Sequence, residues 1–213
     1  MSPVRSGLAE PPDDPARLRR FPVAGPVDRL HRLSEHPQPW FFSSVTDVDE
    51  PSGGRFDLID PDGTCYLAES LDGALVEKLL RSPTKVVVAE RLDELFHLTA
   101  TVTGDLPTAD LTSRRATGHG VNAEIHSTLD YALPRRWARA LRGAGFRAVR
   151  YRLRGDATGR LAGWALFGTA GLHRRAPRGL TTRVVPIDVD GAIEVLADRG
   201  VVVVPIPADV PIT

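Results

Sequence analysis

The chain has 213 residues, 42% of them hydrophobic, which is enough for one generous domain with a single core. Its 27 basic and 27 acidic side chains cancel, so no global field draws it onto nucleic acid or anionic lipid, and we expect neither partner. The single cysteine, Cys65, excludes an internal disulfide, and the sequence has neither a membrane-spanning apolar stretch nor a signal-peptide core near Met1. We therefore expect a protein of the reducing cytoplasm.

The N-terminal part of the sequence predicts a leader followed by a strand. Residues 1–26 are rich in Pro, Arg and Asp without sustained apolar periodicity, which is typical of a loosely ordered segment. A single domain is then expected over residues 27–213. Its first element is a short strand at residues 28–33, where DRLHRL alternates apolar and polar residues and carries Arg32, before two prolines interrupt the pattern.

The next block predicts a strand followed by a helix. Turn signals, PSGG and DPDG, flank RFDLI, and the residues TCYLAES that follow are apolar and compatible with a strand. In SLDGALVEKLLRS, either Ser70 or Asp72 is placed to cap a helix whose leucines share one face. Glu77 lies off the centre of this apolar stripe.

The remaining elements are short and alternate irregularly. In chain order they are a strand at 86–88, a helix near 91–95, an extended piece, a flexible loop at 111–122, the helix ALPRRWARALRGAG, three extended segments (FRAVRYRL, LAGWALFG and TTRVVPID), the helix GAIEVLADRG and a last strand, VVVVPIP. Neither an internal repeat nor a strict βαβ order is visible. The sequence therefore predicts the α+β class, with a mixed sheet and flanking helices.

Several common kinds of site are not supported by the sequence. His119 and His126 lie close together, but no Cys or carboxylate completes a metal-ligand spacing, so we expect no metal site and no prosthetic group. Neither GxGxxG nor a P-loop pattern is present. Ser127 and Thr128 adjoin His126, yet adjacent residues do not form a catalytic triad and no nucleophile elbow is present.

Three blocks, taken in order, carry a family pattern. The first is LHRL, with Arg32. The second and most specific, residues 53–80, has a GRF segment, a YLA strand and a helix with Glu77. The third begins at Asn122 and has a tryptophan-bearing helix, a strand ending in a tyrosine-containing YRL segment, and an ALF strand. Over residues 28–168 these blocks resemble the RES domain family, whose members combine an Arg, a Glu and a Ser.

The resemblance implies a fold, a reaction and a partner. The fold is related to that of ADP-ribosyltransferases, with a split, curved sheet that holds nicotinamide adenine dinucleotide (NAD+) in a cleft. The implied reaction is degradation of NAD+ at its glycosidic bond, with inorganic phosphate (as in a phosphorylase, a transferase) or water as the acceptor. Family members are commonly toxins of toxin–antitoxin pairs, neutralised by a helix-turn-helix antitoxin of the Xre type. An ADP-ribosyltransferase acting on a macromolecule, an inactive binding protein and a homo-oligomer all stay open.

The resemblance assigns catalytic roles to Arg32 and Glu77, and Tyr66 is a third catalytic candidate. Breaking the bond to a cationic nicotinamide passes through an oxocarbenium-like ribose, which needs a carboxylate near the anomeric carbon and cations on the phosphates. Glu77 meets the first need, and Arg32, with its paired donors, meets the second. Tyr66 would stack on the nicotinamide or orient Glu77. The alternatives are a solvated Glu77, an Arg32 paired with Glu35, and an ordinary strand tyrosine.

Four further residues are candidates for binding the dinucleotide: Arg55, Phe56, Trp40 and Arg154. Arg55 would hold the pyrophosphate or an acceptor phosphate, or it would tie its own turn to Asp57 or Asp60, and the two interpretations are level. Trp40 belongs to an aromatic run with Phe41 and Phe42, which forms either a stacking wall or part of the core.

The third signature residue departs from the family pattern. The strand that holds Tyr151 is usually followed by a Ser-Arg pair, but YRLRGD places Leu153 at the Ser position and keeps Arg154. A leucine cannot hydrogen-bond to a ribose hydroxyl or a phosphate. Either the Ser is dispensable, with Ser127 or Thr128 as substitutes, or the activity is altered.

Overall fold

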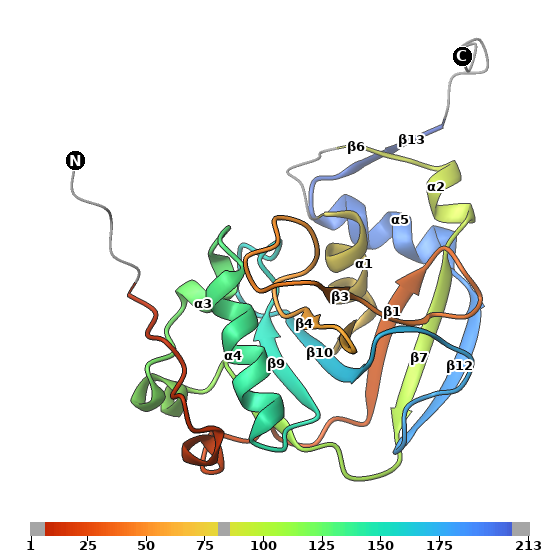
Figure 1. Ribbon diagram of the computed structural model, residues 1–213. Coiled ribbons are helices and arrows are strands. Elements are labelled where there is room, and N and C mark those ends of the chain that lie inside the picture. The colour runs from red at the N-terminus through yellow and green to blue at the C-terminus, as the bar shows by residue number, and fades with distance from the viewer. Residues whose placement is uncertain (1–6, 81–85, 206–213) are drawn as a thin grey trace.

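The computed structural model describes residues 7–80 and 86–205, and a seven-stranded sheet forms its centre. The strands of this sheet are β1 (Arg29–Ser34), β5 (Asp62–Ala68), β7 (Phe96–Val102), β8 (Thr108–Asp110), β9 (Ala148–Arg152), β10 (Ala162–Thr169) and β12 (Leu180–Pro186). Their spatial order is β12-β7-β1-β5-β10-β9-β8 (Figure 1). Neighbouring strands are antiparallel except β8 and β9, which are parallel.

The sheet is split between β1 and β5. Strand β1 pairs with β7 along its whole length, but it pairs with β5 only where His31 lies opposite Ala68. Strand β5 in turn pairs with β10 along its whole length. A three-stranded part, β12-β7-β1, therefore diverges from a four-stranded part, β5-β10-β9-β8. Backbone groups that face the gap must find other partners, so side chains and ligands have access to them there.

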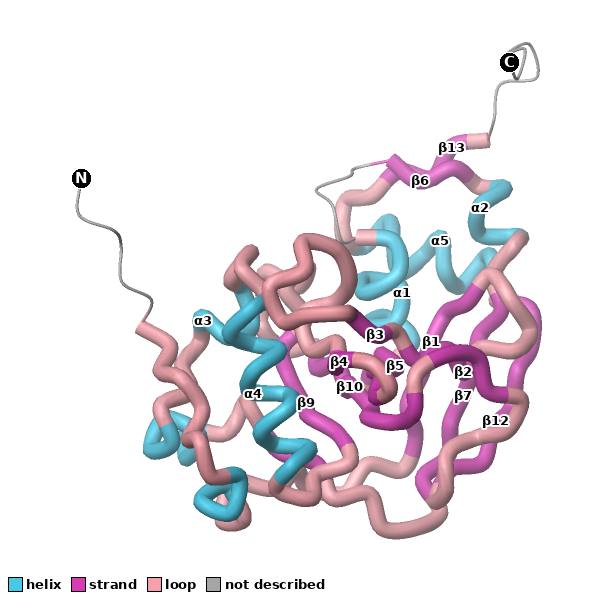
Figure 2. Tube along the Cα trace, viewed as in Figure 1, coloured by secondary structure: helices cyan, strands magenta, loops and turns pink. Residues whose placement is uncertain are grey.

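Smaller elements surround the sheet. They are η1 (Pro15–Leu18), β2 (Trp40–Phe42), β3 (Ser44–Val45), β4 (Leu58–Ile59), β6 (Val86–Val88), α2 (Glu90–Asp93), η2 (Arg114–His119), α3 (Glu124–Ser127), β11 (Gly171–His173) and β13 (Val202–Val204). Strand β11 pairs with β2, β13 with β6 and β3 with β4. The tube view shows helices gathered at the left and top of the molecule and strands at the centre and right (Figure 2).

Three longer helices, α1 (Leu71–Leu79), α4 (Ala132–Gly143) and α5 (Val189–Asp198), flank the sheet. Helix α1 packs against β1 and β5, α4 against β4 and β9, and α5 against α1 and β13. Ser70 caps α1, because its hydroxyl accepts the N–H of Gly73 at 3.1 Å. The second predicted cap, Asp72, instead accepts two hydrogen bonds from Arg199 after α5. The mixed sheet with flanking helices confirms the predicted α+β class.

Alternate strand residues enter two hydrophobic clusters. Leu33 and Tyr66 belong to the larger cluster, which includes buried hydrophobic residues from each of the three long helices. Leu30 and Leu67 belong to the smaller one, which the β2/β11 ribbon supplies with Trp40 and Phe42. Because successive residues of a strand point to opposite faces, the two clusters mark the two faces of the sheet.

Two segments for which the sequence predicts loose structure contain buried residues. Within the expected leader, Leu18 and Phe21 are buried in the larger cluster, and the Trp137 indole N–H donates to the Ala9 carbonyl at 2.8 Å. The expected flexible loop at 111–122 contains η2 and buries Ala116. In both segments the spacing of the buried residues fits neither a helix nor a strand, so the sequence pattern does not predict their burial. Within the described residues, no helix has the length and apolar character to cross a membrane.

Candidate active site

A cleft of about 760 Å³ opens at the split of the sheet. Its walls come from the facing parts of β1 and β5, from α1, and from the loop that leads to β4. A smaller pocket of about 100 Å³ adjoins it. Both are lined by Gly53, Gly54, Tyr66 and Glu77, so they form one continuous site. Arg32, Tyr66 and Glu77, which the sequence assigns to catalysis, all line the larger cleft.

Arg32 bridges the split from β1. Its Nη1 donates to the Tyr66 carbonyl oxygen at 2.8 Å. Its Nε is buried without a hydrogen-bond partner among the described residues. The alternative pairing with Glu35 is not observed, because Glu35 bonds to Lys78 at 2.7 Å, and that bond lowers the pKa of the Glu35 carboxyl. A buried donor left unpaired costs about 1–3 kcal/mol.

Glu77 projects from α1 into the cleft and the adjoining pocket. The Tyr151 hydroxyl of β9 donates to its Oε2 at 3.3 Å, so Glu77 is held from the four-stranded part of the sheet. Sequence analysis does not select Tyr151 as a site residue. Its place in the third family block was the available signal, but the contact with Glu77 spans 74 residues and has no local pattern.

Tyr66 is anchored by Asp57, a second residue that sequence analysis does not assign to the site. The Tyr66 hydroxyl donates to Asp57 Oδ1 at 2.7 Å and accepts the Phe56 N–H at 2.9 Å. Burial, followed by the Asp57 charge, raises the pKa of Tyr66 well above its usual value near 10, so the phenol stays protonated. Of the two roles predicted for Tyr66, orienting Glu77 is not observed, because its hydroxyl bonds to Asp57 instead. Tyr151 makes the contact with Glu77.

Two predicted binding arginines line the smaller pocket, Arg55 and Arg154. Arg55 is buried; its Nη1 donates to the carbonyls of Thr128 and Ile125 at 2.8 and 3.3 Å, and its guanidinium lies 4.9 Å from the Tyr131 ring. Burial is the main cause that lowers the pKa of Arg55. The predicted tie to Asp57 or Asp60 is not observed. Arg55 holds the segment after α3 instead, while Arg154 lies at the exposed mouth of the pocket.

The other two predicted binding residues lie in the core. Phe56 is fully buried, with its ring centroid 5.0 Å from that of Tyr151. Trp40 is buried in the smaller cluster, and its indole N–H donates to the Thr182 hydroxyl at 3.1 Å. Neither lines the cleft or the smaller pocket. Phe41 does line the cleft and is 49% exposed, because the alternation along β2 turns it away from the core.

Leu153, at the position of the family Ser, is buried in the larger cluster and lines neither pocket. Ser127 and Thr128, the predicted substitutes, do not line them either. Hydroxyls reach the cleft from other positions, namely Ser34, Ser43 and Ser44. The cleft is therefore supplied with hydroxyl groups without a contribution from position 153.

His126 is a core histidine. Its Nδ1 accepts the Arg152 N–H at 3.4 Å, and burial, with the nearby charges of Arg152 and Arg55, lowers its pKa to about 4. In the part of the chain that the structure describes, no group of three or more His, Cys, Asp or Glu side chains is placed to hold a metal ion.

Comparison with known proteins identifies the family. The sequence model of the RES domain matches residues 26–188. The chain therefore belongs to the RES domain family. Its fold is similar to that of a chain in the crystal structure of the M. tuberculosis MbcT–MbcA toxin–antitoxin complex, with a TM-score of 0.58, 17% sequence identity, and coverage of 87% of this chain and 98% of that chain. No curated protein sequence matches the chain.

Proposed function

We propose that this protein degrades NAD+ by breaking the bond between the nicotinamide nitrogen and the ribose C1′. One observation carries the proposal: the cationic side chain of Arg32 and the carboxylate side chain of Glu77 line the same cleft. The cleft volume of about 760 Å³ lies within the usual range of small-molecule sites, roughly 300–1,000 Å³. Membership of the RES family supports the choice of substrate.

The chemistry follows from the two charged groups. As the glycosidic bond breaks, its electron pair moves to the nicotinamide, which leaves as a neutral base, and positive charge develops on the ribose. The Glu77 carboxylate would stabilise that charge or hold the ribose hydroxyls, while the Arg32 guanidinium would bind a phosphate oxygen. An oxygen of inorganic phosphate or water then bonds to C1′, and when water is the acceptor one of its protons is released to solvent. Arg154, at the pocket mouth, would be a second cation for the phosphates.

We further propose that the protein is the toxin of a toxin–antitoxin pair, acting in the cytoplasm. The solved structure of similar fold comes from a toxin–antitoxin complex, and this supports a protein partner that neutralises the activity. A helix-turn-helix antitoxin of the Xre type fits the family pattern. Expression of the chain without its partner should then arrest growth.

Product analysis tests the reaction. Purified protein is incubated with NAD+ and phosphate, and the nucleotides are separated. ADP-ribose-1″-phosphate indicates phosphorolysis and free ADP-ribose indicates hydrolysis. If NAD+ is lost only when a macromolecular target is present, the protein is an ADP-ribosyltransferase instead. If the protein causes neither NAD+ loss nor growth arrest, it is a binding protein without this activity.

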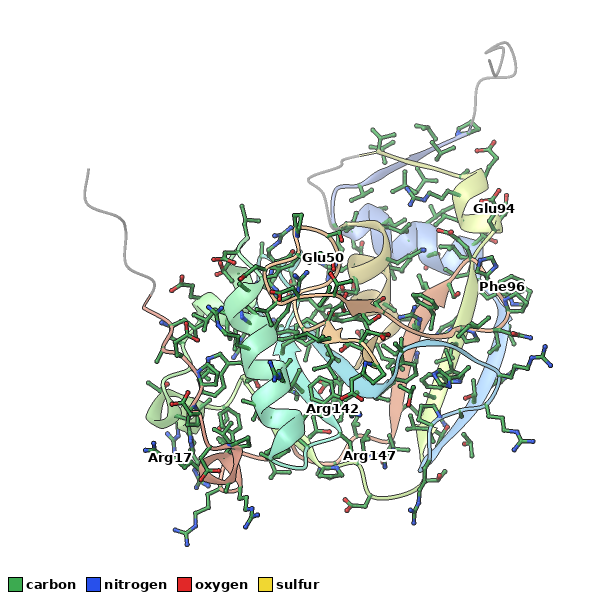
Figure 3. All side chains as sticks on the ribbon, in the orientation of Figure 1. Arg17, Glu50, Glu94, Phe96, Arg142 and Arg147 are labelled. Atoms are coloured by element: carbon green, nitrogen blue, oxygen red, sulfur yellow. The ribbon has the colours of Figure 1, made fainter. Side chains whose placement is uncertain are left out.

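A charge-neutralising substitution tests the site. Glu77→Gln should lower NAD+ turnover about 10²- to 10³-fold and relieve growth arrest, because the amide cannot stabilise a cation. The matched control is Glu94→Gln, an exposed glutamate at the end of α2 that does not line the cleft (Figure 3). Full turnover in Glu77→Gln would remove Glu77 from the mechanism.

A further inference from the structure

Arg135 of α4 is one of the most deeply buried side chains of the molecule, with 1% of its surface exposed. Its guanidinium is paired with backbone carbonyls of one loop. Nε donates to Gly54 at 3.1 Å, Nη1 to Val48 at 3.0 Å and also to Glu50, and Nη2 to Ser52. Four carbonyl oxygens within seven residues of chain thus converge on one planar group.

The loop held in this way, residues 48–54, is a wall of the cleft. Its last two residues, Gly53 and Gly54, line both the cleft and the smaller pocket. Figure 3 marks Glu50 within this loop, which Figure 1 draws in orange between α4 and α1. Arg135 itself lines neither pocket, so its influence on the site passes through the loop.

The wall fits closely against the catalytic side chains. The Gly54 N–H donates to Asp57 Oδ2 at 2.6 Å while its carbonyl accepts from Arg135, so the peptide groups on both sides of this residue are held. A Cβ at Gly54 would lie 2.4 Å from the Tyr66 hydroxyl. Gly53 has a φ of +90°, which few other residues adopt. Gly54 therefore lies directly against the Tyr66 hydroxyl, so a displaced loop changes the shape of the cleft.

We propose that Arg135 is a positioning residue that holds the Gly53–Gly54 wall of the cleft in place for substrate binding. A guanidinium presents five donors in a rigid fork and can satisfy all four carbonyls, whereas the ammonium of a lysine cannot span them. The choice of NAD+ as the test ligand rests on the proposed function. The inference that Arg135 holds the loop does not depend on the proposed function.

The first test measures the loop without using activity. Hydrogen exchange of residues 46–54 is followed by mass spectrometry in the full-length wild type, Arg135→Lys and Arg135→Met. Arg139→Met, which removes an exposed arginine of the same helix, is the matched control. Exchange in the loop should be at least about tenfold faster in both Arg135 variants and unchanged in the control. Wild-type exchange in Arg135→Met would overturn the proposal.

The second test separates binding from chemistry. With NAD+ as substrate, both variants should raise KM about tenfold and change kcat much less, because the wall shapes the cleft but does not touch the reacting atoms. Arg135→Lys, which keeps the charge and the stem, should fall between wild type and Arg135→Met. An inactive wild type would refute the proposed function alone and leave the exchange result standing. An unchanged KM, or failure of both variants to fold, would overturn the positioning role.

Discussion

The two walls of the cleft use arginine in opposite ways. On the β1 wall, Arg32 makes one hydrogen bond across the split of the sheet and keeps a buried Nε without a described partner. Behind the opposite wall, the 48–54 loop, Arg135 of α4 donates to four backbone carbonyls, and Arg55 donates to two more. The Arg135 guanidinium holds a loop through four backbone bonds and is assigned a structural role, whereas Arg32, with a single bond of this kind, keeps donors for a ligand. Substitutions on the β1 wall should therefore change turnover, and those on the α4 side should change stability or loop order.

The largest effect is expected at Arg32. Arg32→Ala should lower kcat/KM for NAD+ about 10³-fold, because it removes the cation that we propose to bind the substrate phosphates, and Arg32→Lys should recover only part of the loss. The melting temperature should stay nearly constant. The lost bond to the Tyr66 carbonyl is worth about 1 kcal/mol, and removal of the unpaired buried Nε offsets it.

The exposed Arg29, on the same strand, is the control for Arg32. Arg29→Ala keeps the Arg32 guanidinium and the split of the sheet, so turnover should be close to that of wild type. A large loss of stability in Arg32→Ala, with turnover reduced only in proportion to the folded fraction, would contradict the assignment of Arg32 to binding. Arg32 would then have a structural role, as Arg135 and Arg55 have.

The next effect concerns acid stability on the opposite side of the cleft. Burial lowers the pKa of His126 to about 4, from an ordinary value near 6.5 that the unfolded chain retains. Between these two values the unfolded state binds the extra proton, so His126 makes the folded state lose stability as the pH falls from about 6.5 to about 4. The free energy of unfolding should decrease by about 3 kcal/mol more in wild type than in His126→Gln over this interval.

Urea unfolding at pH 7 and at pH 4 measures that difference. The exposed His36 provides the control, and His36→Gln should follow the wild-type pH dependence. If His126→Gln and wild type lost the same free energy on acidification, His126 would not be the buried group responsible. Turnover at pH 7 should be unaffected, because His126 lines neither the cleft nor the smaller pocket.

Local patterns predicted the elements that carry Arg32 and Glu77. The alternation in DRLHRL predicts β1, and a capping serine followed by an apolar stripe predicts α1. Each depends on neighbours a few residues apart, where sequence spacing determines which side chains share a face. The family pattern supplied the pairing of the two residues, and the structure brings both to one cleft.

The contacts that hold the site were not predictable in the same way. Tyr151 reaches Glu77 across 74 residues, and Arg135 reaches the 48–54 loop across 81 to 87 residues. Such hydrogen bonds depend on how distant elements pack, and they leave no periodic trace in the sequence. Trp40 and Phe41 show the limit on a smaller scale. The sequence identified an aromatic run, but only the strand register decided which ring is buried.

The smallest effect on substrate binding is expected at Phe41, which also lines the cleft. Its ring lines the cleft while remaining 49% exposed, so it is available to stack on a base of the dinucleotide. Phe41→Ala should raise KM by a factor of about five, near 1 kcal/mol, and change the free energy of unfolding by less than about 0.5 kcal/mol. Leu172 lies opposite Phe41 in the β2/β11 ribbon, is 59% exposed and does not line the cleft. Leu172→Ala should therefore leave KM unchanged, and an equal rise in both variants would assign the effect to the ribbon rather than to the ring.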